Sequence, residues 1–121
     1  MRTLPDKLTT EKINGRPVTR DEAGYLTDPD LWDEDIARKF ATEEDIALAE
    51  EHWAVIRFMR DYLEEHGIAP DARFAFRFLG SRHGTDGAAG RKRFFELFPY
   101  GYVKQACKIA GMRQPRAWST G

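Results

Sequence analysis

Hydrophobic residues recur at helical spacing along most of this chain. The clearest stretch is residues 45–67, DIALAEEHWAVIRFMRDYLEEHG, where Ala49, Trp53 and Ile56 share one helical face. Gly67 supplies its end signal, because glycine accepts the left-handed conformation that closes many helices. Shorter periodic stretches predict four more helices, at residues 31–45, 70–84, 91–98 and 100–111.

Two of these boundaries depend on weaker signals. The run RFAFRF at residues 73–78 also alternates with period two, as a strand would, but a helix is favoured, with Phe74, Phe78 and Leu79 toward the core. The following run, GTDGAAG at residues 84–90, is rich in glycine and predicts a flexible loop.

The N-terminal part has a different pattern. Asn14-Gly15 is a strong hairpin signal, because both residues accept the positive φ of a tight type I′ turn, and Ile13 and Val18 flank it. Pro17 lacks a backbone N–H, so its strand is expected at an edge. A third short extended piece is expected at residues 24–26, which completes a β region at about residues 11–27.

Together these elements predict one mostly α domain of the α+β class. Residues 1–121 are expected to form a small N-terminal β-hairpin, a helical bundle at residues 31–111 with a helix-turn-helix-like core, and a mobile arm at residues 112–121. No apolar run reaches the length of a membrane span, and the N-terminus has no apolar signal segment, so a cytoplasmic protein is expected.

Charge is distributed unevenly along the chain. Residues 1–72 hold 9 Lys/Arg and 18 Asp/Glu, whereas residues 73–121 hold 10 Lys/Arg and 2 Asp/Glu, within a net charge of −1. The basic half could face an anionic partner, or the two halves could neutralise each other in the fold. The sequence leaves both interpretations open.

The only cysteine, Cys107, lies near the end of the last predicted helix. It sits at the margin of an apolar face, which favours a small buried hydrophobe. The alternative is a reactive thiol, because Lys104 and Lys108 would stabilise a thiolate, although a helix C-terminus opposes negative charge. One cysteine makes neither an internal disulfide nor a structural zinc site.

Other chemical signals are weak. His52, His66 and His83 have no ligand spacing, so no metal site is expected, and no motif indicates a cofactor. The basic triplet at residues 91–93 is placed at a helix start, where a phosphate or an acidic partner would be favoured, although a solvated loop edge is the alternative.

Three strings carry a resemblance to a known family. GYLTDPDLW (24–32), EEHWAVIRFMRDYLEEHGIAP (50–70) and RFFELFPYGYVKQACKIAGMRQP (93–115) resemble, in order and spacing, the DsrC/TusE family, over residues 12–116. This family includes the gamma subunit of dissimilatory sulfite reductase and the sulfur-relay protein of tRNA thiolation. The resemblance implies orthogonally packed helices with an N-terminal hairpin, and a role in sulfur transfer or sulfur response.

The resemblance also implies a specific chemistry. Sulfur-carrying members bear a penultimate cysteine on a C-terminal arm, and two-cysteine members have another cysteine eleven positions earlier, within KQACKIAG. This chain matches the inner position with Cys107, whereas Trp118 stands eleven positions on. An indole cannot form a persulfide, and one thiol cannot close an intramolecular disulfide, so the relay chemistry is not expected to carry over intact.

Three functions follow as hypotheses. The first is a noncatalytic partner-binding or regulatory member that docks on sulfite reductase-like or sulfur-relay proteins. The second is a single-thiol persulfide carrier through Cys107, and the third is DNA binding by the helix-turn-helix-like core. The residues expected to bind partners are Arg91, Lys92, Arg93, Lys104, Lys108, Arg113, Arg116 and Trp118.

Overall fold

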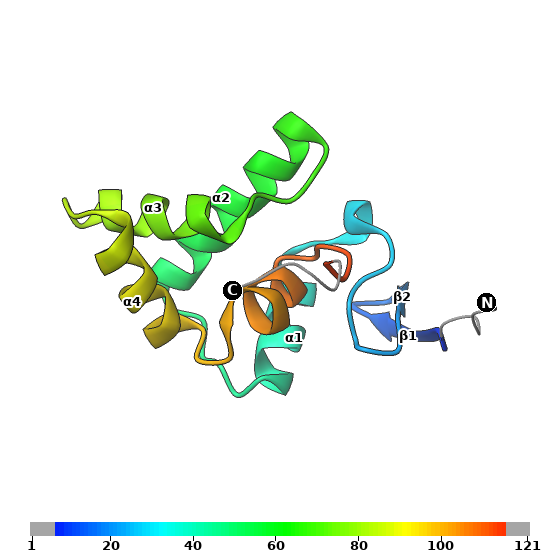
Figure 1. Ribbon diagram of the computed structural model, residues 1–121. Coiled ribbons are helices and arrows are strands. Elements are labelled where there is room, and N and C mark those ends of the chain that lie inside the picture. The colour runs from blue at the N-terminus through cyan, green and yellow to red at the C-terminus, as the bar shows by residue number, and fades with distance from the viewer. Residues whose placement is uncertain (1–6, 116–121) are drawn as a thin grey trace, which may run out of the picture.

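The computed structural model describes residues 7–115. Its elements are β1 (Thr9–Ile13), β2 (Arg16–Arg20), η1 (Pro29–Leu31), α1 (Glu34–Glu43), α2 (Glu50–His66), α3 (Ala72–Arg82), α4 (Gly87–Leu97) and η2 (Tyr102–Cys107). Figure 1 shows η2 in the middle of the view, with α3 and α4 to one side and the hairpin to the other. The expected fold class, mostly α with a small N-terminal hairpin, is confirmed. The helix-turn-helix-like geometry of the core stays a prediction.

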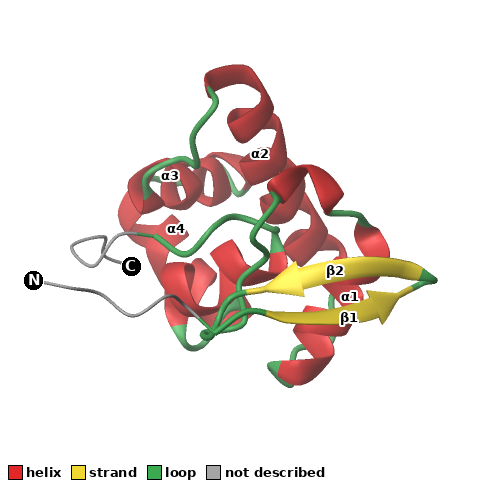
Figure 2. Ribbon diagram, turned by 90° about the vertical axis from the view of Figure 1, so that its right-hand side faces the viewer, coloured by secondary structure: helices red, strands yellow, loops and turns green. Residues whose placement is uncertain are grey.

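The hairpin forms as its turn signal predicts. Asn14 and Gly15 adopt φ values of 55° and 81°, and β1 pairs antiparallel with β2 in a two-stranded sheet. Pro17 pairs with Lys12, which is compatible with its missing N–H because both strands of such a sheet are edges. The third extended piece amounts to a single bridge between Arg20 and Leu26. Figure 2 shows the hairpin lying beside α1.

Aspartates cap three of the helices. The side chains of Asp33, Asp71 and Asp86 each accept a hydrogen bond from a backbone N–H two or three residues further on, at the starts of α1, α3 and α4. The helix expected at residues 70–84 is therefore confirmed as α3, and the strand alternative is wrong. Within α3, however, Phe76 is buried whereas Phe74 and Phe78 are only half-buried.

The flexible loop expected at residues 84–90 is wrong for its second half. Residues 87–90 form the first turn of α4, because Asp86 caps the helix and supplies the start signal that the glycines obscured. The basic triplet at residues 91–93 consequently lies in the second turn of α4 and not at its start. The helix-start argument for a phosphate at these residues therefore fails, since the free N–H groups of a helix belong to its first turn.

Glycines let α3 and α4 cross in close contact. A Cβ atom on Gly90 would lie 1.8 Å from the carbonyl oxygen of Phe76, and one on Gly80 would lie 2.1 Å from that of Asp86. No side chain fits at either position without moving backbone. The glycines of the expected loop thus have a packing role in the helix pair.

A buried histidine holds the start of α2. The backbone N–H of Ala49 donates to Nδ1 of His52 at 3.0 Å, and Nε2 of His52 lies 2.8 Å from the carbonyl oxygen of Leu97. The imidazole is therefore neutral, with the proton on Nε2 donated to Leu97. Burial lowers the pKa of His52, because the charged form would be desolvated and could not accept from Ala49.

This histidine predicts a loss of stability in acid. The pKa of His52 is lower in the folded protein than its value near 6.5 in the unfolded chain, so the unfolded chain takes up the proton first as pH falls. The free energy of unfolding should therefore decrease below about pH 6.5, by up to about 1.4 kcal/mol per pH unit. Urea unfolding from pH 8 to pH 5 measures this slope. In His52→Gln, which cannot titrate, stability should be lower at pH 8 but less dependent on pH. Equal slopes in the two proteins would contradict the role of His52.

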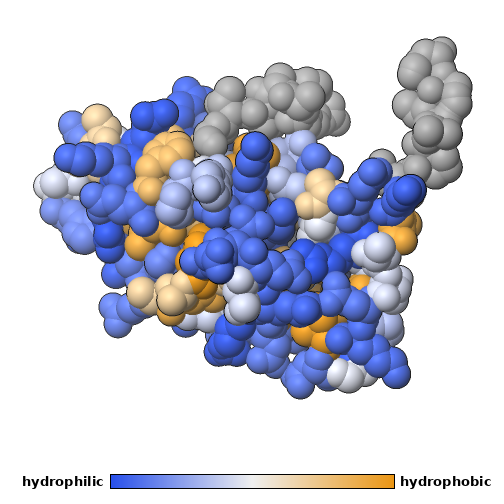
Figure 3. Space-filling model, turned by 90° about the horizontal axis from the view of Figure 1, so that it is seen from below, coloured by the Kyte–Doolittle hydropathy of each residue, from blue (hydrophilic) through white to orange (hydrophobic). Residues whose placement is uncertain are grey.

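Among residues 7–115, no helix combines the length and the apolar character that a membrane span requires. On the face drawn in Figure 3, hydrophilic residues predominate and apolar residues form several separate patches.

Candidate functional site

The helix that carries Cys107 is held from two sides. The hydroxyl of Tyr25, from the segment after the hairpin, donates to the carbonyl oxygen of Val103 at 2.8 Å. The hydroxyl of Tyr102 donates to the carbonyl oxygen of Pro70, in the segment between α2 and α3. Elements that are distant in the sequence thus converge on η2, in agreement with its central place in Figure 1.

The local geometry of η2 buries the thiol. Residues 102–107 form a π-helical turn, which holds more residues per turn than an α-helix. The wider turn carries Gln105, Ala106 and Cys107 inward together, and Cys107 is 0% exposed. The expectation from α-helical spacing, that Cys107 lies at the margin of the apolar face, is therefore wrong, whereas the interpretation as a small buried hydrophobe is confirmed.

The surroundings of Cys107 oppose a thiolate. Burial raises the pKa of Cys107 from 9.0 to about 12, and the neighbouring Tyr102 hydroxyl offsets only part of that rise. Burial also raises the pKa of Tyr25 to about 12, with a further rise from the Cys107 charge. The thiol is therefore protonated at neutral pH.

The carbonyl of Cys107 has a structural role in ending the helix. It accepts from the N–H of Met112 at 2.9 Å, and the N–H of Gly111 donates to the carbonyl oxygen of Lys108 at 3.1 Å. With Gly111 at φ 78°, this is a Schellman motif, and it ends the helix that was expected at residues 100–111. A Cβ on Gly111 would lie 2.4 Å from Cδ1 of Trp32, so the indole closes over this turn.

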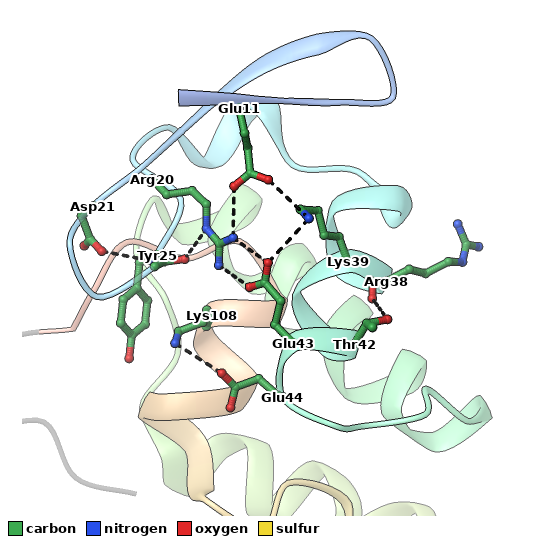
Figure 4. Close-up of polar contacts among 11 residues, drawn as sticks. Glu11, Arg20, Asp21, Tyr25, Arg38, Lys39, Thr42, Glu43, Glu44 and Lys108 are labelled. Carbon is green, nitrogen blue, oxygen red and sulfur yellow. Dashed lines mark hydrogen bonds and ion pairs between the residues drawn. The ribbon is translucent and has the colours of Figure 1, made fainter. Parts of the chain in front are cut away.

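A cluster around Arg20 joins the hairpin to α1. Its guanidinium donates to Glu43 at 2.7 and 2.9 Å, to Glu11 at 3.3 Å and to the carbonyl oxygen of Gly24 at 2.9 Å. It also lies 3.9 Å from the centre of the Phe40 ring. Figure 4 shows Arg20 between the two carboxylates, with Lys39 on their other side. Because Gly24 precedes Tyr25, this cluster fixes the segment whose tyrosine holds η2.

Glu44, directly after α1, links this helix to η2 and to the residue that follows η2. Glu44 accepts from Nε2 of Gln105 at 3.2 Å and from Nζ of Lys108 at 3.4 Å, as Figure 4 shows for Lys108. Nζ of Lys108 also lies 5.2 Å from the centre of the Tyr25 ring. One face of the cysteine-bearing helix is thus closed by polar side chains from the acidic half of the chain.

The Arg20 cluster predicts a measurable contribution to stability. Arg20→Ala should lower the free energy of unfolding by about 2 kcal/mol, because it removes a buried guanidinium from two carboxylates and an aromatic ring. Arg38→Ala is the control: its partners Glu34 and Asp35 are exposed and its guanidinium lies 5.3 Å from the centre of the Trp53 ring, so a change of about 1 kcal/mol or less is expected. Urea unfolding measures both values, and similar losses in the two variants would show that the Arg20 cluster stabilises the fold no more than an exposed ion pair does.

The basic residues expected to bind partners are distributed over several places. Arg93 donates through Nε to Glu51 at 2.6 Å, and the same carboxylate lies 2.7 Å from Nε2 of His83 and 3.4 Å from Nε of Arg82. Burial would raise the pKa of Glu51, but hydrogen bonds from Arg93 and His83 outweigh it and lower the pKa. At this point, as at Glu44 and Lys108, the two halves of the chain neutralise each other.

The other candidates are more exposed. Arg91 and Lys92 lie on α4, Lys104 lies on η2, and Nε of Arg113 donates to the carbonyl oxygen of Thr27 at 3.3 Å. Within the described residues, the second-half cations without a carboxylate inside 4.0 Å are Arg77, Arg91, Lys92, Lys104 and Arg113. Arg116 and Trp118 lie outside the described residues.

A groove of about 780 Å³ lies beside the last described residues. Its lining includes Arg60, Leu63, Ile68, Met112 and Pro115, and Ile68 is 66% exposed. Cys107 is not among the lining residues. Met112, the first residue of the expected arm, is buried.

The described part of the chain holds no group of three or more His, Cys, Asp or Glu side chains placed to bind a metal ion. Every buried side-chain nitrogen or oxygen atom in this part has a hydrogen-bond partner.

Comparison with known proteins decides the family. The model of the family described as "DsrC like protein" matches residues 12–117, nearly the whole chain. The chain belongs to the DsrC-like family. It is 38% identical to the sulfurtransferase TusE of Pectobacterium atrosepticum over 105 residues, which covers 86% of this chain and 94% of that protein. The DsrC/TusE resemblance of the three sequence strings is therefore confirmed.

Solved structures of DsrC proteins have the same fold. The DsrC of Allochromatium vinosum is 37% identical, with a TM-score of 0.78 over 92% of this chain and 98% of that one. The oxidised gamma subunit of dissimilatory sulfite reductase (DsrC) from Archaeoglobus fulgidus is 33% identical, with a TM-score of 0.78 over 90% and 98%. The fold of this chain is therefore shared with solved DsrC proteins over at least 90% of its length.

The sequence pattern did not predict the two tyrosines, Tyr25 and Tyr102, that lie near the thiol and hold its helix. Tyr102 stands five residues before Cys107, a spacing that does not share a face of an α-helix, and Tyr25 is 78 residues from its acceptor Val103. Arg20 and Glu51 likewise find their partners in other elements of the DsrC-like fold. No local pattern marks such contacts.

Proposed function

We propose that this DsrC-like protein binds partner proteins of sulfur metabolism without carrying sulfur on a thiol of its own. One observation supports this most strongly: its only cysteine, Cys107, is fully buried and has a raised pKa. The partners proposed are sulfite reductase-like proteins and sulfur-relay proteins, because the relatives are named as a sulfite reductase subunit and as sulfurtransferases.

A sulfur carrier needs an accessible thiolate. Its sulfur must attack the outer sulfur of a donor persulfide, so that one S–S bond forms while the donor S–S bond breaks and the donor leaves as a thiol. Cys107 meets neither requirement, because no part of it is exposed and its thiol stays protonated. Single-thiol carriage would require η2 to separate from Tyr25 and Pro70.

Trp118 is the proposed anchor for a partner. It occupies the position at which the family resemblance places the sulfur-accepting cysteine, and tryptophan is enriched among residues that dominate binding energy at interfaces. The basic residues proposed to accompany it are Arg91, Lys92, Arg93, Lys104, Lys108, Arg113 and Arg116. DNA is a weaker candidate partner, because Arg93 and Lys108 already pair with carboxylates of the same chain.

A binding experiment with two variants tests this function. Parent protein, Cys107→Ser and Trp118→Ala would each be titrated against purified sulfite reductase and sulfur-relay proteins of the same organism. Cys107→Ser should bind with an affinity within about twofold of the parent, whereas Trp118→Ala should lose more than about 1 kcal/mol of binding energy. Circular dichroism would confirm that both variants are folded.

Two outcomes would contradict the proposal. If folded Cys107→Ser lost binding while Trp118→Ala kept it, the thiol would be the functional group. If the parent bound neither class of protein but bound duplex DNA with a steep salt dependence, the regulator hypothesis would replace it.

A further inference from the structure

Two arginines without carboxylate partners lie at the seam between α3 and α4. The guanidinium of Arg77 lies 5.0 Å from the centre of the Phe74 ring, and that of Arg91 lies 5.1 Å from the centre of the Phe95 ring. Stacking of this kind holds a guanidinium by one face and leaves its N–H edge free to donate in the plane. Both arginines are therefore positioned on aromatic supports while their donors remain available.

Other basic side chains of α3 and α4 lie along the same seam as Arg77 and Arg91. A Cβ on Gly87 would lie 3.2 Å from Cγ of Arg77, so Arg77 reaches across to the start of α4. Arg91 stands one turn after Gly87 on the same face of α4, and Arg73 stands one turn before Arg77 on α3. Lys92, also exposed, adjoins Arg91. We call this set the α3–α4 arginine surface: Arg73, Arg77, Arg91 and Lys92.

The positive charge of this surface is little compensated within the protein. Among the described residues, Arg77, Arg91 and Lys92 have no carboxylate within 4.0 Å, and the exposed carboxylate of Asp71 pairs with Arg73 and interacts more weakly with Arg77, which contributes to its lowered pKa. Arg82 and Arg93, on the same two helices, are paired with Glu51 and belong to the structural set. The pairing thus separates cations that stabilise the fold from cations that remain free to bind.

We propose that the α3–α4 arginine surface docks a carboxylate-rich surface of a partner protein. This inference rests on the proposed function, in that it supplies the binding face for a partner. A planar guanidinium matches a carboxylate with two parallel N–H···O bonds, and Arg77 and Arg91 present such edges on supported side chains. The aromatic rings beneath them reduce the freedom that binding would otherwise remove.

A protein carboxylate cluster fits this surface better than a nucleic acid. Duplex DNA presents closely spaced phosphates over a long distance and requires an extended basic track. Here Asp71 lies at one end of the surface, beside Arg73, and Glu96 follows Arg91 and Lys92 on α4. A small basic surface in a chain of net charge −1 is suited to a local acidic cluster.

Anisotropy with a fluorescein-labelled oligoglutamate peptide, and separately with a duplex DNA of similar net charge, tests this proposal. The peptide should bind the full chain with an affinity that falls as salt rises. Arg77→Glu/Arg91→Glu should weaken peptide binding by about tenfold or more. The control Lys7→Glu/Lys12→Glu changes net charge equally at exposed positions of the hairpin side, and should weaken binding by about twofold or less.

A variant that keeps the charge tests the geometry. Arg77→Lys/Arg91→Lys should still weaken peptide binding by about threefold, because lysine lacks the planar fork. Equal losses in the two charge-reversal variants would overturn the proposal, since net charge alone would then explain binding. Tighter binding of the DNA than of the peptide, lost in Arg77→Glu/Arg91→Glu, would reassign the surface to nucleic acid. None of these outcomes depends on sulfur uptake by Cys107, so failure here is distinguishable from failure of the proposed function.

Discussion

Iodoacetamide is expected to alkylate Cys107 at least about a thousandfold more slowly in the folded protein than in the unfolded chain at pH 8. The raised pKa, about 12 against 9.0, alone reduces the thiolate fraction by about three powers of ten, and burial blocks access in addition. Intact mass recorded over time, with and without urea, measures both rates. As pH rises toward 11 the folded rate should increase, because the thiolate fraction grows.

An exposed thiol in the same molecule provides the control. Ser81→Cys places a second thiol on the exposed side of α3, and this variant should gain one adduct quickly and the second slowly. If both adducts formed at similar rates in the folded protein, the buried and protonated state of Cys107 would be wrong.

The largest loss of stability is expected from Gly90→Ala. Its new Cβ would lie 1.8 Å from the carbonyl oxygen of Phe76, and that backbone atom is part of α3. The helix pair must separate to admit the methyl group, so we expect a loss of about 3 kcal/mol or more in the free energy of unfolding. Urea unfolding followed by circular dichroism measures it.

Gly87→Ala is the matched control in the same helix. Its Cβ would meet only Cγ of the Arg77 side chain, at 3.2 Å, and Gly87 is not in the left-handed region. Alanine favours a helix interior over glycine by up to about 1 kcal/mol, and the contact is with a side chain and not with backbone, so this variant should stay within about 1 kcal/mol of the parent. A Gly90→Ala protein as stable as Gly87→Ala would mean that α3 and α4 are not in close contact.

The elements that sequence alone predicted are those with strong local signals. Asn14-Gly15 required positive φ values and formed the hairpin turn, and Gly67 ended α2 in the left-handed region. The amphipathic pattern of residues 45–67 likewise predicted α2, although the helix begins later, at Glu50, where His52 holds the first turn. In each case the information lies within a few neighbouring residues.

The errors arose where a residue serves a tertiary contact. Gly90 belongs to a glycine-rich run that is typical of a loop, but it lies inside a helix. Glycine is needed there because the backbone of α3 lies too close for a side chain. Alpha-helical spacing predicts Cys107 at the margin of an apolar face, whereas in the π-helical turn it is fully buried. A one-residue change in helical register cannot be read from hydrophobic spacing.

The candidate site could be predicted only in part, for the same reason. The family resemblance identified Cys107 and the DsrC-like fold, whereas the pairing of Glu51 with Arg93 spans 42 residues of sequence. That pairing decides which basic residues are structural. The sequence pattern did not indicate Arg77 as a binding residue, because its neighbours Phe74 and Gly87 lie on different helices.

Intact mass after exposure to a persulfidated donor protein tests the central claim, that Cys107 is a packing residue and not a sulfur carrier. The folded parent should show no gain of about 32 Da, the mass of one sulfur atom, whereas the urea-unfolded chain should show it as a positive control. A gain of this mass in the folded parent that disappears in Cys107→Ser would contradict the account and establish Cys107 as the carrier.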